Sequence, residues 1–447
     1  MTKKYWTDRA WIDGCWLTDV QLHVDSDGKI AALQAGVERG DAVDLGGVVI
    51  PGIPNVHSHA FQWTFAGLSE FRTVQRDSFW SWREQMYHSV ERLSPEAYYH
   101  RACRLFRLML AAGYTEVGEF HYIHNQPDGR PYPQAGLLAD QLVQAAVDTG
   151  IAICMLPVLY QRGGFDGRPL VGAQRRFQLS IEQLQSVAQE LLAKWGAEPR
   201  FRLGLAFHSL RAVDPDTIGP VLERLNPLIG SAAPVHIHVA EQTAEIADCQ
   251  SRYGKRPVEL LLDTVQVDGR WCLIHATHMT EQECGRLAES GAVAGLCPTT
   301  EANLGDGLFP VADFIEAGGR ISIGSDSHVA LDPFAELRLL EYGQRLTTHR
   351  RAVLSDTERS CGDRLLAEVL AGGCRAMGHA GSGQISLHQP ANLVVLDAEH
   401  PALSDCPMER IIDRAVFCQW GGAVRKTLVR GQVVFDRDEQ AQPAQQD

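Results

Sequence analysis

The chain has 447 residues, 45% of them hydrophobic, and its 41 basic and 55 acidic side chains give a formal net charge of −14. This length suffices for one large domain with a substantial core and a small second domain. Because the basic residues form no stripe or cluster, the charge argues against binding to nucleic acid or to an anionic membrane.

Neither a membrane span nor a secretory signal is recognisable in the sequence. No stretch reaches the ~18 apolar residues that a spanning helix needs, and the first residues lead into no apolar run. The 11 cysteines are scattered, without a Cys-x-x-Cys pair. This spacing is typical of reduced, mostly buried thiols rather than of a disulfide framework, and we expect a cytoplasmic protein.

The first 48 residues read as short β-segments with little helical character. Three segments are expected, at residues 9–16, 20–24 and 30–33, and the third follows a turn from Asp25 to Gly28. These segments are too few to form a large core of their own. We therefore expect them to form part of a small domain.

From residue 48 onwards, apolar strands alternate with long helix-like segments. Eight strands are expected, at residues 48–56, 114–120, 151–159, 201–207, 235–239, 271–275, 292–297 and 320–324. Helix-like segments fall between most of them, among them 95–112, 136–149, 180–195, 215–228 and 280–290. This alternation predicts a (β/α)8 barrel of the TIM type over residues 49–380, and a doubly wound parallel sheet is the main rival.

Strand-like segments return near the C-terminus, at residues 393–396 and at 426–435 around the turn Arg430-Gly431. Because they and the N-terminal segments flank a closed barrel, the two groups could pair. We expect one small β-sandwich domain built from residues 1–48 and 381–437. Residues 438–447 are polar and low in complexity, and we predict a disordered tail there.

Histidines and acidic residues lie at the ends of four predicted strands. At the end of the first strand, His57 and His59 can point into one volume, because alternate side chains of a strand share a face. The others are His236 and His238 in the fifth strand with Glu241 just beyond it, His275 and His278 at the end of the sixth, and Asp326 and His328 at the end of the eighth. Any one of these could be a hydrogen-bonded core residue. Together, at the strand ends where a barrel collects its catalytic groups, they favour a metal site.

Imidazoles and a carboxylate suit Zn²⁺, which in a catalytic site keeps one position for the water that it activates. Two-metal hydrolases of related architecture use a bridging lysine at the end of the fourth strand, and residues 201–209 contain none. The nearest lysines, Lys194 and Lys255, fall in helix-like stretches. We therefore expect one zinc ion per subunit.

The motifs His57-x-His59, His238-x-x-Glu241, His275 and Ser325-Asp326 resemble, in this order, the amidohydrolase superfamily in its mononuclear aminohydrolase branch. The resemblance covers nearly the whole chain. It implies that His57, His59, His238 and Asp326 bind the metal. It also implies that Asp326 takes a proton from the water and that Glu241 and His275 handle the protons of the leaving nitrogen. His236, His278 and His328 would then be structural.

Five further stretches, at residues 57–62, 77–84, 119–122, 207–211 and 300–307, resemble the members of that branch that hydrolyse N-formimino-L-glutamate in histidine degradation. The resemblance implies a substrate-binding set that holds two carboxylates: Gln62, Arg83, Tyr122, His208 and Arg211. Arginine suits this role because its guanidinium pairs with carboxylates in bidentate geometry. Arg83 could instead pair with Glu84 or Glu91.

The expected reaction is therefore the hydrolysis of N-formimino-L-glutamate to N-formyl-L-glutamate and ammonia. One alternative is a deaminase that acts on a purine or another ring amine. A ring pocket would favour stacking aromatics and amides over paired arginines. A second alternative is a metal-binding barrel without activity, which would have no use for Glu241 and His275. The resemblance also implies a homodimer.

Overall fold

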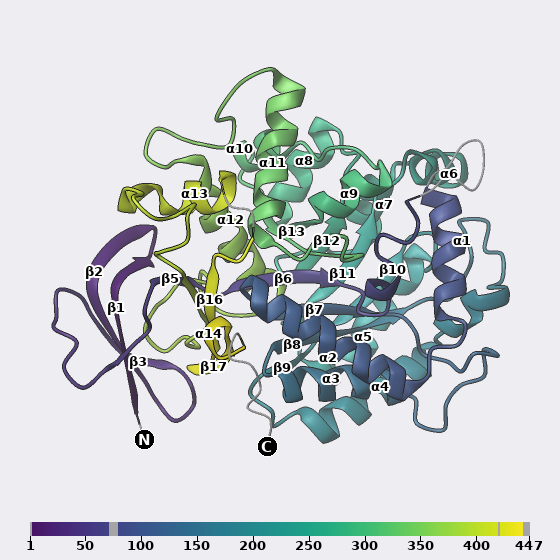
Figure 1. Ribbon diagram of the computed structural model, residues 1–447. Coiled ribbons are helices and arrows are strands. Elements are labelled where there is room, and N and C mark those ends of the chain that lie inside the picture. The colour runs from purple at the N-terminus through teal and green to yellow at the C-terminus, as the bar shows by residue number, and fades with distance from the viewer. Residues whose placement is uncertain (1, 71–78, 419–420, 441–447) are drawn as a thin grey trace.

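The structure is a computed structural model and describes residues 2–70, 79–418 and 421–440. It contains a parallel barrel and a second sheet built from both ends of the chain (Figure 1), which confirms the predicted fold class. Asp77 and Ser78 of the stretch 77–84, and residues 441–447 of the predicted tail, lie outside the described residues.

The barrel strands run in sequence order and are parallel. They are β6 (Ile53–Ser58), β7 (Tyr114–His121), β8 (Ala152–Leu159), β10 (Leu205–Ser209), β11 (Val235–Val239), β12 (Trp271–His275), β13 (Val293–Leu296) and β14 (Arg320–Ile323), and the short β9 (Phe201–Leu203) pairs with β8. The first and last strands meet where the N–H of Asp326 donates to the carbonyl of His57 at 3.0 Å. The closure of the barrel therefore brings two predicted ligand segments side by side.

The predicted strand at residues 48–56 is in fact two strands that serve different sheets. β5 (Val48–Pro51) pairs with the small sheet, whereas β6 pairs with β7 of the barrel. Gly52 separates them, and a Cβ atom there would lie 2.4 Å from Oγ1 of Thr115. Only glycine fits this close approach, so the chain can change sheets at this point.

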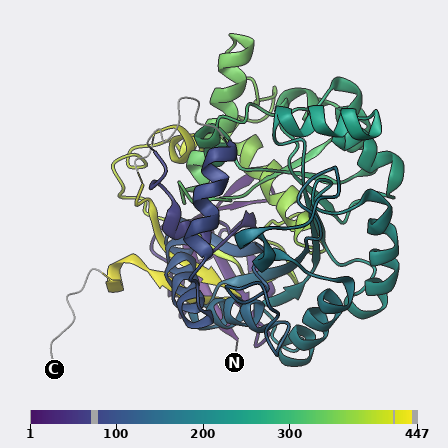
Figure 2. The ribbon, with the colours of Figure 1, turned by 90° about the vertical axis from the view of Figure 1, so that its right-hand side faces the viewer.

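Helices surround the barrel strands (Figure 2). They are α2 (Pro95–Ala112), α3 (Leu137–Thr149), α4 (Ile181–Trp195), α5 (Pro215–Ile229), α6 (Thr243–Tyr253), α7 (Pro257–Thr264), α8 (Glu281–Ser290), α9 (Pro298–Leu304), α10 (Val311–Glu316), α11 (Pro333–Thr348) and α12 (Cys361–Ala376). The five predicted helices agree with five of these to within one residue at each end. None of the helices in the described residues is both long enough and apolar enough to cross a membrane.

The start and end of α2 illustrate why these boundaries were predictable. Oγ of Ser94 accepts a hydrogen bond from the N–H of Ala97 at 3.2 Å and so caps the N-terminus ahead of Pro95. At the other end, Gly113 adopts a φ of 100°, which ends the helix. The buried side of α2 packs into the core that joins the barrel strands to their helices.

The small domain is one continuous sheet with a separate apolar core. Its strands are β1 (Lys3–Ile12), β2 (Cys15–Val24), β3 (Ile30–Gln34), β4 (Val43–Asp44), β5, β15 (Leu393–Leu396), β16 (Val424–Val429) and β17 (Gln432–Asp436). The predicted segment 9–16 was wrong, because the chain turns at Asp13 and Gly14 to join two ten-residue strands. Both residues of this turn have positive φ, and the pair Asp-Gly is a recognised signal of a two-residue hairpin turn.

Three helices lie outside the barrel ring: α1 (Phe79–Val90), α13 (Ile411–Phe417) and α14 (Arg437–Gln440). Short 3₁₀ turns occur at η1 (Gln62–Phe65), η2 (Gly172–Phe177) and η3 (Met408–Arg410). Helix α14 includes residues 438–440, which the sequence assigned to the disordered tail. The side chain of Asp438 pairs with Arg425 at 2.7 Å, and this contact ties the segment to β16.

Candidate active site

A cavity of about 510 Å³ opens at the C-terminal ends of the barrel strands. All the predicted site residues line it except His57, which is fully buried in β6. Helix α1 covers one side with Phe79, Trp82 and Arg83. The structure therefore brings together residues that are up to 269 positions apart, between His57 and Asp326.

His57 in β6 and His59 just after it face Asp326 across the seam where the barrel closes. Nε2 of His59 lies 3.3 Å from Oδ1 of Asp326, and Nε2 of His57 lies 3.6 Å from the same oxygen. Gly324 makes this approach possible, since a Cβ atom there would lie 2.7 Å from the Cβ of His57. Asp326 itself has a φ of 43°, a strained conformation for a residue other than glycine.

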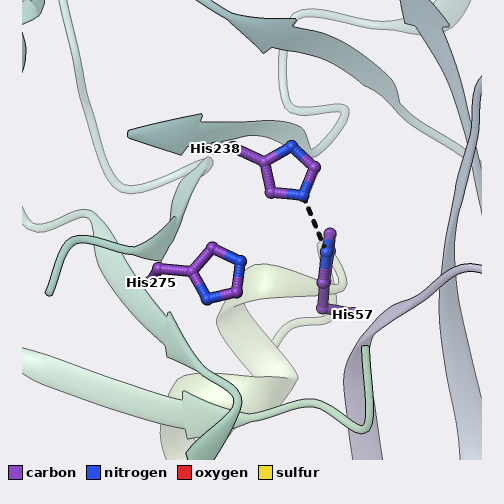
Figure 3. Close-up of side chains that lie close together, drawn as sticks. All are labelled: His57, His238 and His275. Atoms are coloured by element: carbon purple, nitrogen blue, oxygen red, sulfur yellow. Dashed lines mark hydrogen bonds between the residues drawn. The ribbon is translucent and has the colours of Figure 1, made fainter. Parts of the chain in front are cut away.

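His238 at the end of β11 completes the cluster. Its Nε2 lies 2.9 Å from Nε2 of His57 (Figure 3). Its Nδ1 lies 2.9 Å from the carbonyl of His208, and Nδ1 of His59 lies 2.9 Å from the carbonyl of Phe120. Because a carbonyl only accepts, each Nδ1 carries the proton and each Nε2 presents a lone pair to the centre of the cluster.

Burial keeps these imidazoles neutral. It lowers the pKa of His59 to about 3 and also lowers the pKa values of His57 and His238, with the neighbouring histidines adding to the effect for both. Burial raises the pKa of Asp326 to about 7, and the carboxylate of Glu241 adds to this.

The donor set fits a metal ion. Nε2 of His57 and Nε2 of His238 lie within hydrogen-bond distance of each other, and Nδ1 of His57 is buried without a partner among the described residues, so no contact in the described chain fixes Nε2 of His57 as a donor. His57, His59 and Asp326 offer ligand atoms that lie within 4.8 Å of one another, as do His57, His238 and His275. Two rings are also held through Nδ1 by backbone carbonyls, which is typical of metal-ligating histidines. The residues fit a metal.

His275 lies between three carboxylates. Its Nδ1 is 3.1 Å from Oε1 of Glu301, and its Nε2 is 3.9 Å from Oε1 of Glu241 and 3.7 Å from Oδ2 of Asp326. Burial acts to lower the pKa of His275, but Glu241, Glu301 and Asp326 outweigh it and raise that pKa to about 10. The three carboxylates thus favour the protonated form of the ring.

The other half of the cavity carries the predicted substrate-binding residues. Arg211 follows β10, is 8% exposed, and has its Nη2 3.9 Å from Oε2 of Glu241. Arg83 lies 4.5 Å from the ring of Trp80 and forms no ion pair with a carboxylate of the described chain, so the alternative of pairing with Glu84 or Glu91 is not observed. Both guanidiniums leave Nε without a hydrogen-bond partner among the described residues.

Gln62, Tyr122 and His208 lie beside these arginines. Nε2 of Gln62 donates to the hydroxyl of Tyr122 at 3.0 Å, and Oε1 of Gln62 has no partner in the described part of the chain. The ring of Tyr122 lies 5.2 Å from that of His208. Burial raises the pKa of Tyr122 and lowers that of His208, so both are neutral hydrogen-bonding groups.

The three histidines that the sequence assigned to structural roles lie outside the cavity lining. His236 contacts the carbonyl of Ala376 through Nε2 at 2.8 Å, and Nδ1 of His328 lies 2.9 Å from Oγ of Ser325. His278 follows β12 and lies beside Gly307. The metal-ligand groups found among the described residues include none of these three.

Two buried glutamates contribute to the site although the sequence assigned them no role. Glu119 of β7 accepts hydrogen bonds from Oγ of Ser58 at 2.6 Å and from the N–H of Ala60 at 2.8 Å, and so holds the segment around His59. Glu301 contacts His275. Both lie in stretches whose resemblance was noted, and that resemblance was the only signal that could have found them.

The model of the amidohydrolase family matches residues 48–434, nearly the whole chain. The chain belongs to the amidohydrolase family. A formimidoylglutamate deiminase from Pseudomonas aeruginosa is 45% identical over 428 residues, which cover 96% of this chain and 93% of that protein. A 5-methylthioadenosine/S-adenosylhomocysteine deaminase from Natronomonas pharaonis is 26% identical and covers 88% of this chain and 82% of its own length.

Among solved structures, an amidohydrolase from Brucella melitensis is similar with a TM-score of 0.90 and 40% identity, covering 98% of this chain and 97% of its own. An adenosine deaminase from Xanthomonas campestris with bound zinc has a TM-score of 0.78 at 22% identity, covering 96% and 92%, and this likeness shows the fold alone. Amidohydrolases are metal-dependent hydrolases, and the buried cluster around His57 agrees with this.

Proposed function

We propose that this amidohydrolase hydrolyses the C=N bond of N-formimino-L-glutamate and yields N-formyl-L-glutamate and ammonia. The observation that carries the proposal is the pairing of two guanidiniums, Arg83 and Arg211, with a metal-ligand cluster in one cavity. A substrate with two carboxylates needs such fixed cations inside a protein with a net charge of −14. The relative from Pseudomonas aeruginosa, a formimidoylglutamate deiminase, agrees with this assignment.

For the metal, we infer one Zn²⁺ per subunit, held by His57, His59, His238 and Asp326. The neutral imidazoles and single carboxylate are ligands that zinc prefers, and residues 201–209 around β10 contain no lysine for a second ion. A bound Zn²⁺ supplies the Lewis acidity that lets water act as a nucleophile near neutral pH.

The side chains around His275 move the protons of the reaction. Asp326 accepts a proton as water adds to the formimino carbon, because its carboxylate lies beside the histidines of the metal cluster, where the water would be activated. The attacking water loses both of its protons and the departing nitrogen gains two. Glu241 takes up a proton released from the water and passes it to that nitrogen, and the proton held by Asp326 follows, so that ammonia leaves as the carbon–oxygen double bond forms. The imidazolium of His275 stabilises the negative charge that develops on the new oxygen.

The arginine half of the cavity holds the substrate while these steps occur. Arg211 and Arg83 each pair with a carboxylate, and Gln62, Tyr122 and His208 offer neutral hydrogen bonds beside them. Fixing both ends of a flexible substrate positions the formimino carbon at the metal and removes much of the entropic cost of reaching the transition state.

An assay of ammonia release tests the choice of substrate. The zinc-loaded protein should release ammonia from N-formimino-L-glutamate and not from guanine, cytosine or adenosine. The ring alternative has support from the 26% identical deaminase, but the two guanidiniums of the cavity do not suit a neutral base. Activity on a base alone would overturn the proposal, and inactivity on every compound would favour a metal-binding barrel without catalysis.

We further propose that the chain acts in histidine degradation, in the cytoplasm, as a homodimer that binds neither nucleic acid nor membranes. The acidic net charge supports the absence of polyanionic partners. Tyr342 and Leu346 lie one turn apart on α11 and are 38% and 75% exposed. Their apolar side chains would be covered if this face of α11 met a second subunit. Sedimentation of the wild-type protein and of Leu346→Glu tests the dimer, which the charge should weaken.

A further inference from the structure

Helix α9 begins directly after β13 and places a buried acid behind the catalytic histidine. Glu301 lies in the first turn of α9 and is 4% exposed. Its Oε1 accepts two hydrogen bonds, from the N–H of Cys297 at 2.8 Å and from Nδ1 of His275 at 3.1 Å. Glu301 does not line the cavity. Any effect that it has on the substrate must therefore pass through His275.

The contact fixes which nitrogen of His275 faces the reaction. The N–H of Cys297 can only donate, so it keeps Oε1 of Glu301 in place as an acceptor, and Nδ1 of His275 must carry a hydrogen. Nε2, on the opposite side of the ring, then points toward Glu241 and Asp326. The backbone of His275 has a φ of 66°, a strained conformation that persists only when surrounding contacts enforce it.

We propose that Glu301 is a positioning residue that holds His275 in the Nδ1–H form with Nε2 directed toward Glu241 and Asp326. The inference rests on the proposed function and adds a member to its machinery. The contacts run from the N–H of Cys297 to Glu301, from Glu301 to the imidazole of His275, and from that ring toward the reacting atoms. In other hydrolases, a carboxylate that accepts a hydrogen bond from Nδ1–H of a catalytic histidine orients the ring and stabilises its imidazolium form.

Two variants of Glu301 separate orientation from charge. Glu301→Leu removes the acceptor and should lower kcat about 100-fold, a loss typical of removing the partner of an active-site histidine, with KM and zinc content unchanged. Glu301→Gln removes the charge but keeps an acceptor. The N–H of Cys297 selects the orientation in which the amide oxygen stays toward His275. Glu301→Gln should therefore retain kcat to within about tenfold and so rescue most of the loss.

Glu336→Gln is the matched control, because it loosens the start of α9 without touching His275. Both oxygens of Glu336 accept hydrogen bonds from Thr299 in the same turn of α9, at 2.6 and 2.9 Å, and Glu336 does not line the cavity. This variant should lower thermal stability without changing kcat. An equal loss of kcat in Glu336→Gln and Glu301→Leu would mean that Glu301 only anchors the helix, and the proposal would be overturned.

A spectroscopic readout keeps the test independent of turnover. In zinc-loaded protein with ¹⁵N-labelled histidine, one protected Nδ1–H resonance should disappear in His275→Asn and in Glu301→Leu and persist in Glu301→Gln. Persistence in Glu301→Leu would contradict the inference. If the wild type released no ammonia from N-formimino-L-glutamate while the resonance behaved as expected, the proposed function would fail and the positioning contact would stand.

Discussion

The two halves of the cavity differ in how their polar groups are satisfied. In the metal half, His59 and His238 are tied to the backbone carbonyls of Phe120 and His208, and His275 is tied to Glu301. In the substrate half, Arg83 and Arg211 leave Nε without a partner among the described residues. Most rings of the first half are thus oriented by contacts within the protein, with Nδ1 of His57 left without a partner among the described residues, whereas the second half presents donors that a carboxylate ligand would satisfy.

Gln62 sharpens this contrast. Its Nε2 donates to Tyr122 and its Oε1 has no partner in the described chain. Turning the amide over would keep the contact, with the tyrosine hydroxyl donating, and would present an NH₂ donor to the cavity. The Gln62 amide can therefore present either an acceptor or a donor to the substrate. The variants below should therefore separate turnover from substrate binding.

The largest effect is expected from Glu241→Gln in the metal half. The amide cannot carry the proton to the leaving nitrogen, so kcat should fall about 1,000-fold, within the range for removal of a general acid or base. Zinc content, measured by atomic absorption, should equal that of the wild type because Glu241 is not a ligand. Loss of the metal together with activity would make Glu241 a ligand and would contradict its assigned role.

Arg211→Met should mainly damage the substrate half. It leaves a substrate carboxylate unpaired in a buried position, and steady-state kinetics should show KM raised about 100-fold, equivalent to roughly 2.7 kcal/mol. Zinc content should not change. Arg162→Met is the control, because Arg162 pairs with Asp214 at 2.8 Å and does not line the cavity. Its KM should match the wild type; an unchanged KM in Arg211→Met would remove that residue from the site.

Arg83→Met should have a smaller effect in the same direction. Arg83 is more exposed than Arg211 and is held by stacking on Trp80 at 4.5 Å rather than by an acid. We expect KM to rise about tenfold, because a carboxylate near solvent loses less when its partner is removed. A change in kcat with an unaltered KM would place Arg83 in the chemistry rather than in substrate binding.

The last effect concerns the stability of the metal-stripped protein rather than turnover, and it depends on pH. Burial holds the pKa of His59 at about 3, below the value of the unfolded chain, so the unfolded state binds more protons as the pH falls below 6.5. The metal-stripped protein should therefore lose stability between pH 6.5 and 4, by about 1.4 kcal/mol per pH unit for each such histidine. Denaturant unfolding of His59→Gln should show a shallower pH dependence, and identical slopes would show that His59 is not buried neutral.

The sequence predicted the barrel because alternating strands and helices leave a strong periodic pattern, and it predicted the residues that the structure brings together at the strand ends. It did not predict that residues 48–56 form two strands, since both are apolar and only Gly52 marks the change of sheet. It also missed the helix at residues 437–440, which depends on a distant ion pair, and the hairpin at Asp13, although the pair Asp13-Gly14 is a turn signal that the sequence contains.

The contacts that orient the site were also hidden from the sequence. Backbone carbonyls of Phe120 and His208 hold two of the predicted ligands, and a carbonyl leaves no trace in residue identity. Glu301 lies 26 positions from His275 and meets it only because neighbouring strands place their ends together. Local sequence patterns identify the reacting side chains. The groups that orient these side chains come close to them only when the barrel closes.

Identification of the products tests the central claim most directly. Proton NMR of a reaction with N-formimino-L-glutamate should show N-formyl-L-glutamate appearing in step with substrate loss, with one ammonia released per turnover in a coupled assay. This outcome requires that the terminal nitrogen leaves the formimino carbon while the nitrogen of the glutamate stays attached to it. Formation of glutamate and formamide, or no reaction in the zinc-loaded protein, would contradict the account.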